Sequence, residues 1–271
     1  MKVIEQSAEN ITNISFNRDS IYAHIERCGR TCYKSENKIT QDSAEKFIKD
    51  ILINKHYSVL EHGTIYLTVP SYLVGVLCFY SNNPYSRVNY NPTEPFAYIT
   101  TNYRVIMEND RECDLQYCVT NDKSKFKLRY TFRFITNRQI ANELVRHRVF
   151  SFSQESTRFC NYNTNRFNNE LTFIRPYYID ALSIDEPKEE EEIIFVNYCK
   201  QVERDYNSLT TLYNAQAGAQ ILPNCLKTEI VVTGYEDDWK QLLKIRYEGI
   251  AGAPHIQMKE LMMRIKNVFE K

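Results

Sequence analysis

Apolar residues recur at helical spacing in several segments, and the clearest segment lies between Asp42 and Asn54. Its apolar positions follow a period of about 3.6 residues, and they are Ala44, Phe47, Ile48, Ile51 and Leu52. Asp42 and Glu45 also have the spacing of a capping box, so this helix is predicted to begin at Asp42. Similar patterns predict helices over 20–33, from Asn137 through Arg148, from the acidic run 189–192 to near Ala217, around 239–243, and from Pro254 to Phe269. Acidic residues suit a helix N-terminus, so the acidic run is interpreted as a solvated helix start rather than a metal site.

Alternation of apolar and polar residues predicts strands in other parts of the chain. The most regular run is 126–135, and shorter runs predict strands over 64–69, 171–174 and 228–233. A further strand is expected over 102–108. The stretch from Asn82 to Thr100 is rich in Asn, Pro, Ser and Tyr and is predicted to be a long loop. Residues 110–118 are expected to form a short helix at most, and 150–169 is a polar stretch.

The order of these elements bears on the fold class. Helices and strands are interspersed without a βαβ rhythm, and the chain has no internal repeat and no low-complexity linker. This pattern favours a single mixed α+β domain over residues 1–271. A chain of 271 residues is long enough for a substantial core.

Composition excludes several classes of protein. Hydrophobic residues make up 43% of the chain and charged residues 25%, so a largely disordered chain is excluded. The 34 basic and 34 acidic residues cancel, which argues against a nucleic-acid or anionic-membrane binder that uses its whole surface. A local basic pocket is compatible with this zero net charge.

Glycine and cysteine patterns narrow the chemistry further. The seven glycines form neither G-x-G-x-x-G nor G-x-x-x-x-G-K, so a bound dinucleotide would not use a Rossmann fingerprint or a P-loop. The eight cysteines include no C-x-x-C pair, so no metal site is expected, and free packing thiols in a reducing cytoplasm are predicted. No secretory signal is seen at the start of the sequence. The most apolar window, 64–80, is interrupted by Pro70 and Gly75, so no membrane span is predicted.

The densest chemical signal is the segment Arg146–Arg158. It holds three arginines, a histidine and several hydroxyl side chains at the predicted end of a helix. On that helix Glu143 can share a face with Arg146 and His147. One guanidinium group can donate two parallel hydrogen bonds to the oxygens of a phosphate, so the segment is a candidate anion site. The alternative is a solvated basic helix end whose arginines neutralise the helix dipole.

This segment resembles the signature of the flavin-dependent thymidylate synthases (ThyX). The resemblance rests on Arg146-His147-Arg148 followed by Ser156 and Arg158. It extends to about three quarters of the chain, and 82–126 is the least comparable part. The other matching blocks are 29–33, 56–62, 142–145, Leu222-Pro223-Asn224 with 228–233, 239–246 and 255–258.

The resemblance implies a ThyX-like fold with a central, mainly antiparallel sheet flanked by helices, and a homotetramer with active sites between subunits. It implies FAD as cofactor, dUMP as substrate, methylenetetrahydrofolate as carbon donor and NADPH as reductant. Arg246 would be catalytic, stabilising charge on the uracil ring as C5 becomes nucleophilic. The implied cofactor-binding residues are His56, Ser58, Arg146, His147, Arg148, Gln154 and His255. The implied substrate-binding residues are Glu143, Arg146, Gln154, Glu155, Ser156, Thr157, Arg158 and Arg246.

Some positions depart from the family pattern. Ala219 stands where members commonly carry an arginine that reaches dUMP, and Lys227 is one cation that could compensate. Tyr235 and Gln241 stand where flavin-contacting Asn or His is common, and extra residues separate Arg246 from His255. One alternative is therefore a related flavin and folate enzyme that acts on another pyrimidine nucleotide or makes a hydroxymethyl product. Another is a non-catalytic module that stacks nucleotides or single-stranded nucleic acid on the tyrosines of 82–100.

Three further histidines have simpler interpretations from the residues alone. His24, in an amphipathic helix, is expected at the surface. His62 is expected to be a buried hydrogen-bonding residue, with a functional role as the alternative. His255 is expected near the cap of the last helix, and the flavin contact that the resemblance implies is its alternative.

Overall fold

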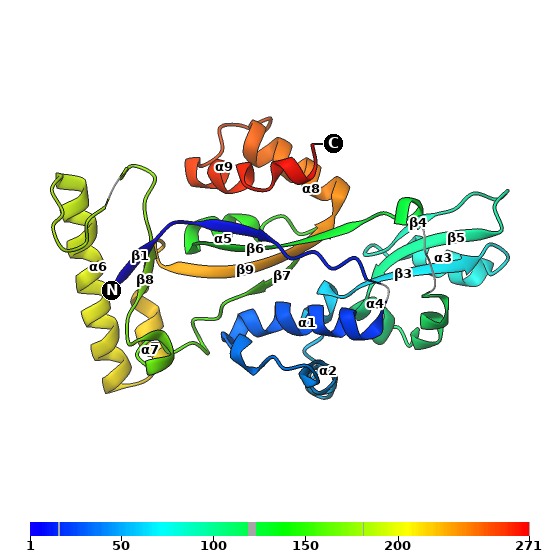
Figure 1. Ribbon diagram of the computed structural model, residues 1–271, viewed down its shortest axis with the longest axis horizontal. Helices are drawn as coiled ribbons and strands as arrows, with labels where there is room; N and C mark the ends of the chain where they lie inside the picture. The colour runs from blue at the N-terminus through cyan, green and yellow to red at the C-terminus, as the bar shows by residue number, and fades with distance from the viewer. Residues whose placement is uncertain (16, 119–122, 181, 271) are drawn as a thin grey trace.

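The computed structural model describes residues 1–15, 17–118, 123–180 and 182–270. Its centre is a four-stranded sheet in the order β2-β6-β9-β7, with every neighbouring pair antiparallel (Figure 1). The strands are β2 (Ser7–Asn10), β6 (Arg129–Asn137), β9 (Lys227–Tyr235) and β7 (Ser151–Gln154). This sheet and the helices around it confirm the predicted α+β class.

One face of the central sheet carries the aromatic residues of β6. Phe132 and Phe134 project from this face and pack with the fully buried Trp239, whose ring centroid lies 4.9 Å from that of Phe132. The covering helices are α5 (Arg138–Leu144), α8 (Glu236–Leu243) and α9 (Ile256–Met263), with a π-helical segment, Lys244–Glu248, directly after α8. Figure 1 shows α8 and α9 together on one side of the sheet.

The opposite face of the sheet is covered by α1 (Arg18–Tyr33), with α2 (Ser43–Ile53) beyond it. A 3₁₀ segment, Tyr57–His62, follows α2 and contacts α1 and β7. His24 on α1 is only 8% exposed, and its Nε2 lies 3.2 Å from the hydroxyl of Thr131 on β6. The expectation of a surface position for His24 is therefore wrong, because α1 packs this part of its surface on the sheet.

A second sheet, in the order β3-β5-β4, extends to one side of the molecule (Figure 1). Its strands are β3 (Thr64–Pro70), β5 (Phe96–Asn102) and β4 (Arg87–Asn89). Helices α3 (Val74–Asn82) and α4 (Tyr103–Glu108) and a 3₁₀ segment, Glu112–Tyr117, accompany them. The predicted loop over 82–100 thus contains β4 and the start of β5. The strand predicted over 102–108 is also wrong, because Asn102 caps a helix by accepting a hydrogen bond from the Val105 N–H.

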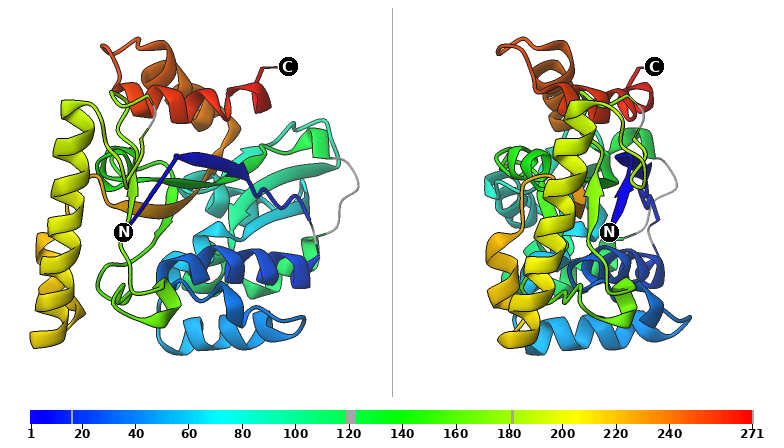
Figure 2. Two further views of the ribbon diagram at one scale, coloured as in Figure 1. Left: turned by 60° about the vertical axis from the view of Figure 1, so that its left-hand side comes forward. Right: turned by 90° about the vertical axis from the view of Figure 1, so that its left-hand side faces the viewer.

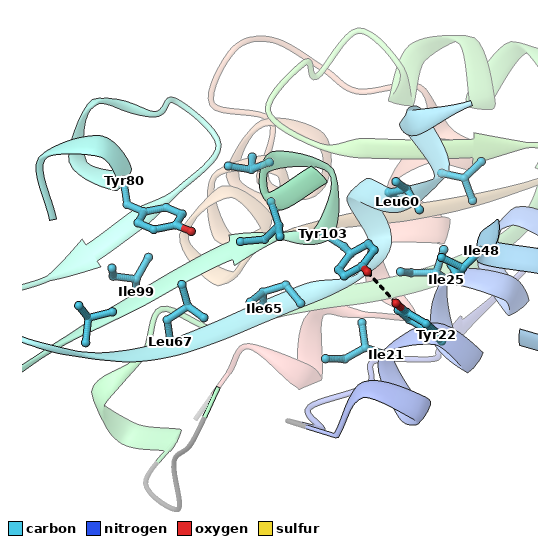
Figure 3. Close-up of a cluster of buried hydrophobic side chains, with 14 of the residues drawn as sticks. Ile21, Tyr22, Ile25, Ile48, Leu60, Ile65, Leu67, Tyr80, Ile99 and Tyr103 are labelled. Atoms are coloured by element: carbon cyan, nitrogen blue, oxygen red, sulfur yellow. Dashed lines mark hydrogen bonds between the residues drawn. The ribbon is translucent and has the colours of Figure 1, made fainter. Parts of the chain in front are cut away.

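The second sheet and α1 share an apolar core, drawn in Figure 3. Within it the hydroxyl groups of Tyr22 on α1 and Tyr103 on α4 lie 2.6 Å apart. Segment 82–126 is therefore built into the core of the protein through β5 and α4.

The third group of elements lies beside the central sheet. Strand β1 (Lys2–Ile4) pairs in parallel with β8 (Thr172–Ile174), and the long helix α6 (Glu190–Leu212) runs alongside (Figure 2). The helix predicted to end near Ala217 stops at Leu212, and Asn214 caps a separate short helix, α7 (Ala215–Gly218). Further 3₁₀ turns are Glu36–Lys38, Lys123–Lys125, Asn165–Phe167, Ala219–Ile221 and Lys266–Val268.

The predicted helix ends are only partly correct. Asn137 caps α5 as predicted by accepting from the Ile140 N–H, but α5 ends at Leu144, before Arg148. The predicted capping box is wrong, because the Asp42 side chain makes no capping hydrogen bond. The polar stretch 150–169 contains β7, whose partner β9 is distant in sequence. Among the helices of the described ranges, none combines the length and the apolar character needed to cross a bilayer.

Candidate active site

Arg246 is held by two residues of the α5 region. Its Nε donates to Nε2 of His147 at 3.0 Å, and its Nη1 donates to a carboxylate oxygen of Glu143 at 3.3 Å. Arg246 belongs to the π-helical segment after α8. This geometry is rare in proteins as a whole, but where it occurs it is often at a functional site. Gly249 ends that segment with φ +80°, a left-handed conformation that glycine adopts without strain.

The contact with Arg246 sets the state of His147. Burial lowers the pKa of His147, and the positive charge of Arg246 lowers it further. The imidazole is therefore neutral near pH 7. Because Nε2 accepts the hydrogen bond from Arg246, the ring proton of the neutral form resides on Nδ1. His147 thus orients the guanidinium without competing with it for anions.

Arg246 lines a cavity of about 320 Å³ beside α5. The other lining residues are Gln139, Asn142, Glu143, Arg146 and Asn224. Two guanidinium groups, one carboxylate and three amides therefore face the same space, a set that can bind an anion and the polar edge of a base. The cavity brings together three of the predicted site residues, Glu143, Arg146 and Arg246.

Sequence reasoning missed the three amide residues of this cavity. Gln139 lies four residues before Glu143 and seven before Arg146 on α5, so the same helical spacing that selected Glu143 also indicates Gln139. Asn224 lies in a block that resembles the family, but no role was assigned to it. Asn142 had no comparable signal.

The loop Gln154–Arg158 does not line this cavity. Gln154 donates from Nε2 to the Thr228 hydroxyl at 3.2 Å. The Ser156 N–H donates a hydrogen bond to the carbonyl of Cys32, near the end of α1. Arg158 is exposed, with its guanidinium carbon 5.3 Å from the ring centroid of Phe159, and Thr157 is half-buried. Within one chain the predicted dUMP residues therefore form two separate groups.

Glu155 belongs to a buried ion cluster. Its side chain is fully buried and lies 2.7 Å from Nζ of Lys227, which also contacts Glu229 at 2.7 Å. Lys34 adds a second cation, 2.8 Å from Glu229. Burial alone would raise the pKa of Glu229, but Lys227 and Lys34 outweigh it and lower this pKa to about 2. Glu155 therefore has a structural partner in its own chain.

The same ion cluster decides whether Lys227 can compensate for the arginine that is absent at Ala219. Ala219 is half-buried and packs against the core beside α6. Lys227 is neutralised by two carboxylates, so it offers little net charge to a nucleotide. Compensation for the absent arginine by Lys227 is not supported by this geometry.

The remaining predicted cofactor residues are distributed over the surface. Arg148 is exposed, and so are His56 and Ser58, at the start of the 3₁₀ segment that contacts α1 and β7. None of these three lines the Arg246 cavity. His255 is the N-cap of α9, where its Nδ1 accepts from the Gln257 N–H at 3.2 Å, which confirms the expected cap position.

His62 connects the 3₁₀ segment to the central sheet. It is fully buried, with Nδ1 2.8 Å from the Thr233 hydroxyl and Nε2 2.9 Å from the Ser153 hydroxyl. The prediction of a buried hydrogen-bonding residue is confirmed. Through Ser153 on β7, His62 fixes the segment that carries His56 and Ser58 next to the strand that leads into the Gln154–Arg158 loop.

Tyr235 does not face the Arg246 cavity. It is 7% exposed, and its hydroxyl lies 2.9 Å from the carbonyls of both Tyr85 and Thr100. This side chain therefore joins β9 to the segment 82–126. Gln241 on α8 is exposed and does not line that cavity either.

Sequence comparison identifies relatives of known name. The family model described as "Thymidylate synthase complementing protein" matches residues 125–270, more than half of the chain. The chain is 31% identical over 126 residues to a flavin-dependent thymidylate synthase of Corynebacterium diphtheriae, covering 41% of this chain and 45% of that protein. It is 32% identical over 116 residues to one of Corynebacterium efficiens, covering 41% and 46%. The match spans about half the length of these curated relatives.

Structure comparison finds a more distant likeness. Two crystal structures of a UMP/dUMP methylase, PolB from Streptomyces cacaoi, one with 5-Br dUMP and one with 5-Br UMP, align with 99% of this chain and with 92% and 91% of theirs. The TM-scores are 0.46 and 0.44, at 12% sequence identity. This likeness is weaker than the match to the family model.

Proposed function

The chain belongs to the thymidylate synthase complementing protein family, and on this premise we propose that it is a flavin-dependent thymidylate synthase. It would methylate dUMP at C5 to give dTMP, with methylenetetrahydrofolate as carbon donor and NADPH as reductant. Residues 1–271 would form one catalytic domain, with 82–126 as a less comparable insertion that contributes β5 and α4 to its core. The observation that carries this proposal is the fixed position of Arg246 between Glu143 and His147 in a cavity lined by amides.

Arg246 suits the uracil ring of dUMP. For C5 to become nucleophilic, the ring must take an enolate-like form in which negative charge is shared between C5 and a carbonyl oxygen. A guanidinium already oriented by a carboxylate and an imidazole can stabilise that charge without further reorganisation. The side-chain amide of Gln139 is suited to the hydrogen-bonding edge of the base.

Arg146, His147 and Arg148 suit a flavin dinucleotide. Two exposed guanidinium groups flank His147, and their planar donors match diphosphate oxygens in a chain that has no glycine fingerprint. His56, Ser58, Gln154 and His255 would complete the binding of FAD. When bound there and reduced by NADPH, FAD would supply the hydride needed for the methyl group.

We also propose that the two groups of dUMP residues meet across an interface between copies of the chain. Arg158 and the 3₁₀-segment residues His56 and Ser58 are exposed, and they lie apart from the Arg246 cavity. Ser156, Thr157 and Arg158 of one copy would hold the phosphate, while Glu143, Arg146 and Arg246 of another would hold the base. A homotetramer with sites between subunits satisfies this requirement.

A second candidate is a related enzyme that acts on another pyrimidine nucleotide or leaves a hydroxymethyl group. Two observations favour it: the neutral Ala219 stands where an arginine is common, and Lys227 is already paired with two carboxylates. Losing one charge-assisted hydrogen bond to a nucleotide costs on the order of 1.5–3 kcal/mol.

Product analysis decides between the two candidates. The purified protein is incubated anaerobically with FAD, NADPH and methylenetetrahydrofolate, together with dUMP in one reaction and UMP in another, and the mass of each nucleotide product is measured by mass spectrometry. A methyl group on dUMP is the expected result. A hydroxymethyl product, or methylation of UMP in preference to dUMP, would favour the second candidate, and an unchanged nucleotide would refute both.

A further inference from the structure

A second cleft adjoins the Arg246 cavity. It has a volume of about 480 Å³, within the range of small-molecule sites, and lies between α6, the segment after β8 and the start of α9. Gln139 and Asn224 line both this cleft and the Arg246 cavity. The two spaces are therefore neighbours that share an amide-lined border.

Three tyrosine side chains line this cleft. Tyr177 and Tyr178 follow β8, and Tyr198 faces the cleft from α6. All three are partly open to solvent, at 44%, 55% and 50% exposure. The ring of Tyr177 stands edge-on to those of Tyr178 and His255, at centroid distances of 5.5 and 5.8 Å. Open aromatic rings of this kind favour stacking with a flat ligand.

Hydrogen-bonding groups are available at the border of the cleft. The Nδ1 atom of His255 accepts from the Gln257 N–H, so in the neutral ring Nε2 carries the proton. Within the described part of the chain, that Nε2 has no hydrogen-bond partner, and neither do the side-chain amides of Gln139 and Asn224. These groups can bind the carbonyl and amide edges of a heterocycle.

We propose that this cleft binds a flat nitrogen heterocycle with amide or imide edges, stacked on Tyr178 and Tyr198 and bonded by His255 and Asn224. This inference rests on the proposed function, which supplies three ligands with such a ring. The rings are the nicotinamide of NADPH, the pterin of the carbon donor and the flavin itself. A ring in this cleft lies next to the cavity that holds the base, so the two ligands would be bound together.

The test uses binding rather than turnover. Tyr178→Leu and Tyr198→Leu each remove a stacking surface, and Tyr213→Leu is the matched control, because Tyr213 is a 73% exposed tyrosine just after α6 that does not line the cleft. Affinities for NADP⁺, folate, FAD and dUMP are measured by calorimetry on the full chain of each variant. We expect both cleft variants to lose about tenfold in affinity for one of the three heterocyclic probes, while dUMP affinity and the control stay unchanged. The probe that weakens identifies the ring.

A further variant, Tyr178→Trp, tests the proposal even if the leucine variants fail to fold. Trp239 is the single tryptophan of the chain and is fully buried, so Tyr178→Trp introduces the one exposed indole. Saturable quenching of its fluorescence by the same probe supports the proposal. If no heterocycle quenches it and all three bind the leucine variants as they bind the native chain, the proposal is overturned. A protein that makes no dTMP but binds a heterocycle in this Tyr178-dependent way would refute the proposed function and retain the cleft.

Discussion

The Nε atom of Arg246 donates to Nε2 of His147 at 3.0 Å, although the two residues are 99 positions apart. This bond ties the π-helical segment after α8 to the end of α5, and the Glu143 carboxylate holds the same guanidinium from α5 itself. The cation is thereby fixed before any ligand arrives. A fixed cation is what charge stabilisation on a nucleotide base requires.

Replacement of Arg246 should therefore reduce turnover far more than stability. Arg246→Lys keeps the charge but loses the planar fork that bonds both His147 and Glu143. We expect kcat for dUMP methylation to fall by about a hundred- to a thousandfold, as when one preorganised donor is lost, with a nearly unchanged melting temperature. Arg264→Lys, at an exposed position just after α9, is the control. A kcat for Arg246→Lys equal to that of the control would rule out this role.

The buried ion cluster should be important for stability. Lys227→Met leaves the fully buried Glu155 without its cation. Breaking a buried pair in this way destabilises a protein by about 3–5 kcal/mol. The matched control is Lys49→Met, which breaks the exposed Lys49–Glu45 pair and should cost under about 1 kcal/mol. Urea unfolding of both variants measures the difference, and equal losses would contradict a structural role for Glu155.

Stability should fall as the pH drops below 6.5 because of His24. Burial lowers the pKa of His24 to about 4, and the charges of Arg27 and Arg129 act in the same direction. The unfolded chain takes up a proton near pH 6.5 while the folded chain does not, so stability rises with pH between about 4 and 6.5. His24 alone should remove about 2 kcal/mol at pH 5 relative to pH 7.5. The free energy of unfolding of His24→Gln should depend on pH less steeply than that of the native chain. Identical pH profiles for the two proteins would show that His24 does not titrate as this burial requires.

Two glycines should respond to alanine in opposite ways. A Cβ at Gly234 on β9 would lie 2.2 Å from the ring of Phe150, so Gly234→Ala overpacks the core and should cost about 1–3 kcal/mol. A Cβ at Gly75, in helix α3, would meet no atom within 4 Å, and Gly75→Ala should stabilise the chain by about 0.5–1 kcal/mol. Thermal unfolding checks both. Phe150→Leu should recover part of the loss in the Gly234 variant, and failure to do so would place the strain elsewhere.

Local patterns were enough to predict much of the fold. The periodicity of 42–54 and the alternation of 126–135 are properties of neighbouring residues, and both elements are present with small shifts of their ends. Strands β4 and β5 were missed because their stability comes from pairing with β3, which local composition does not reveal. His24 was placed at the surface because its partner Thr131 lies 107 residues away.

In the candidate site too, some residues could be predicted from local sequence and others could not. Glu143, Arg146 and Arg246 were selected from motif and helix spacing, and one cavity brings them together. Asn224 was not selected, because its place in that cavity depends on how the segment before β9 folds against α5. Glu155 was taken as a ligand residue, and its buried bond to Lys227 could not be read from a sequence in which the two are 72 positions apart.

The most direct test of the central claim is the visible absorbance spectrum of the purified protein, recorded before and after addition of dUMP. The account predicts the bands of oxidised flavin and a shift of these bands when dUMP binds beside it, and the shift should be absent in Arg246→Lys. A colourless protein that also takes up no added FAD would contradict the account, and the arginines of 146–158 would then form only a phosphate-binding surface.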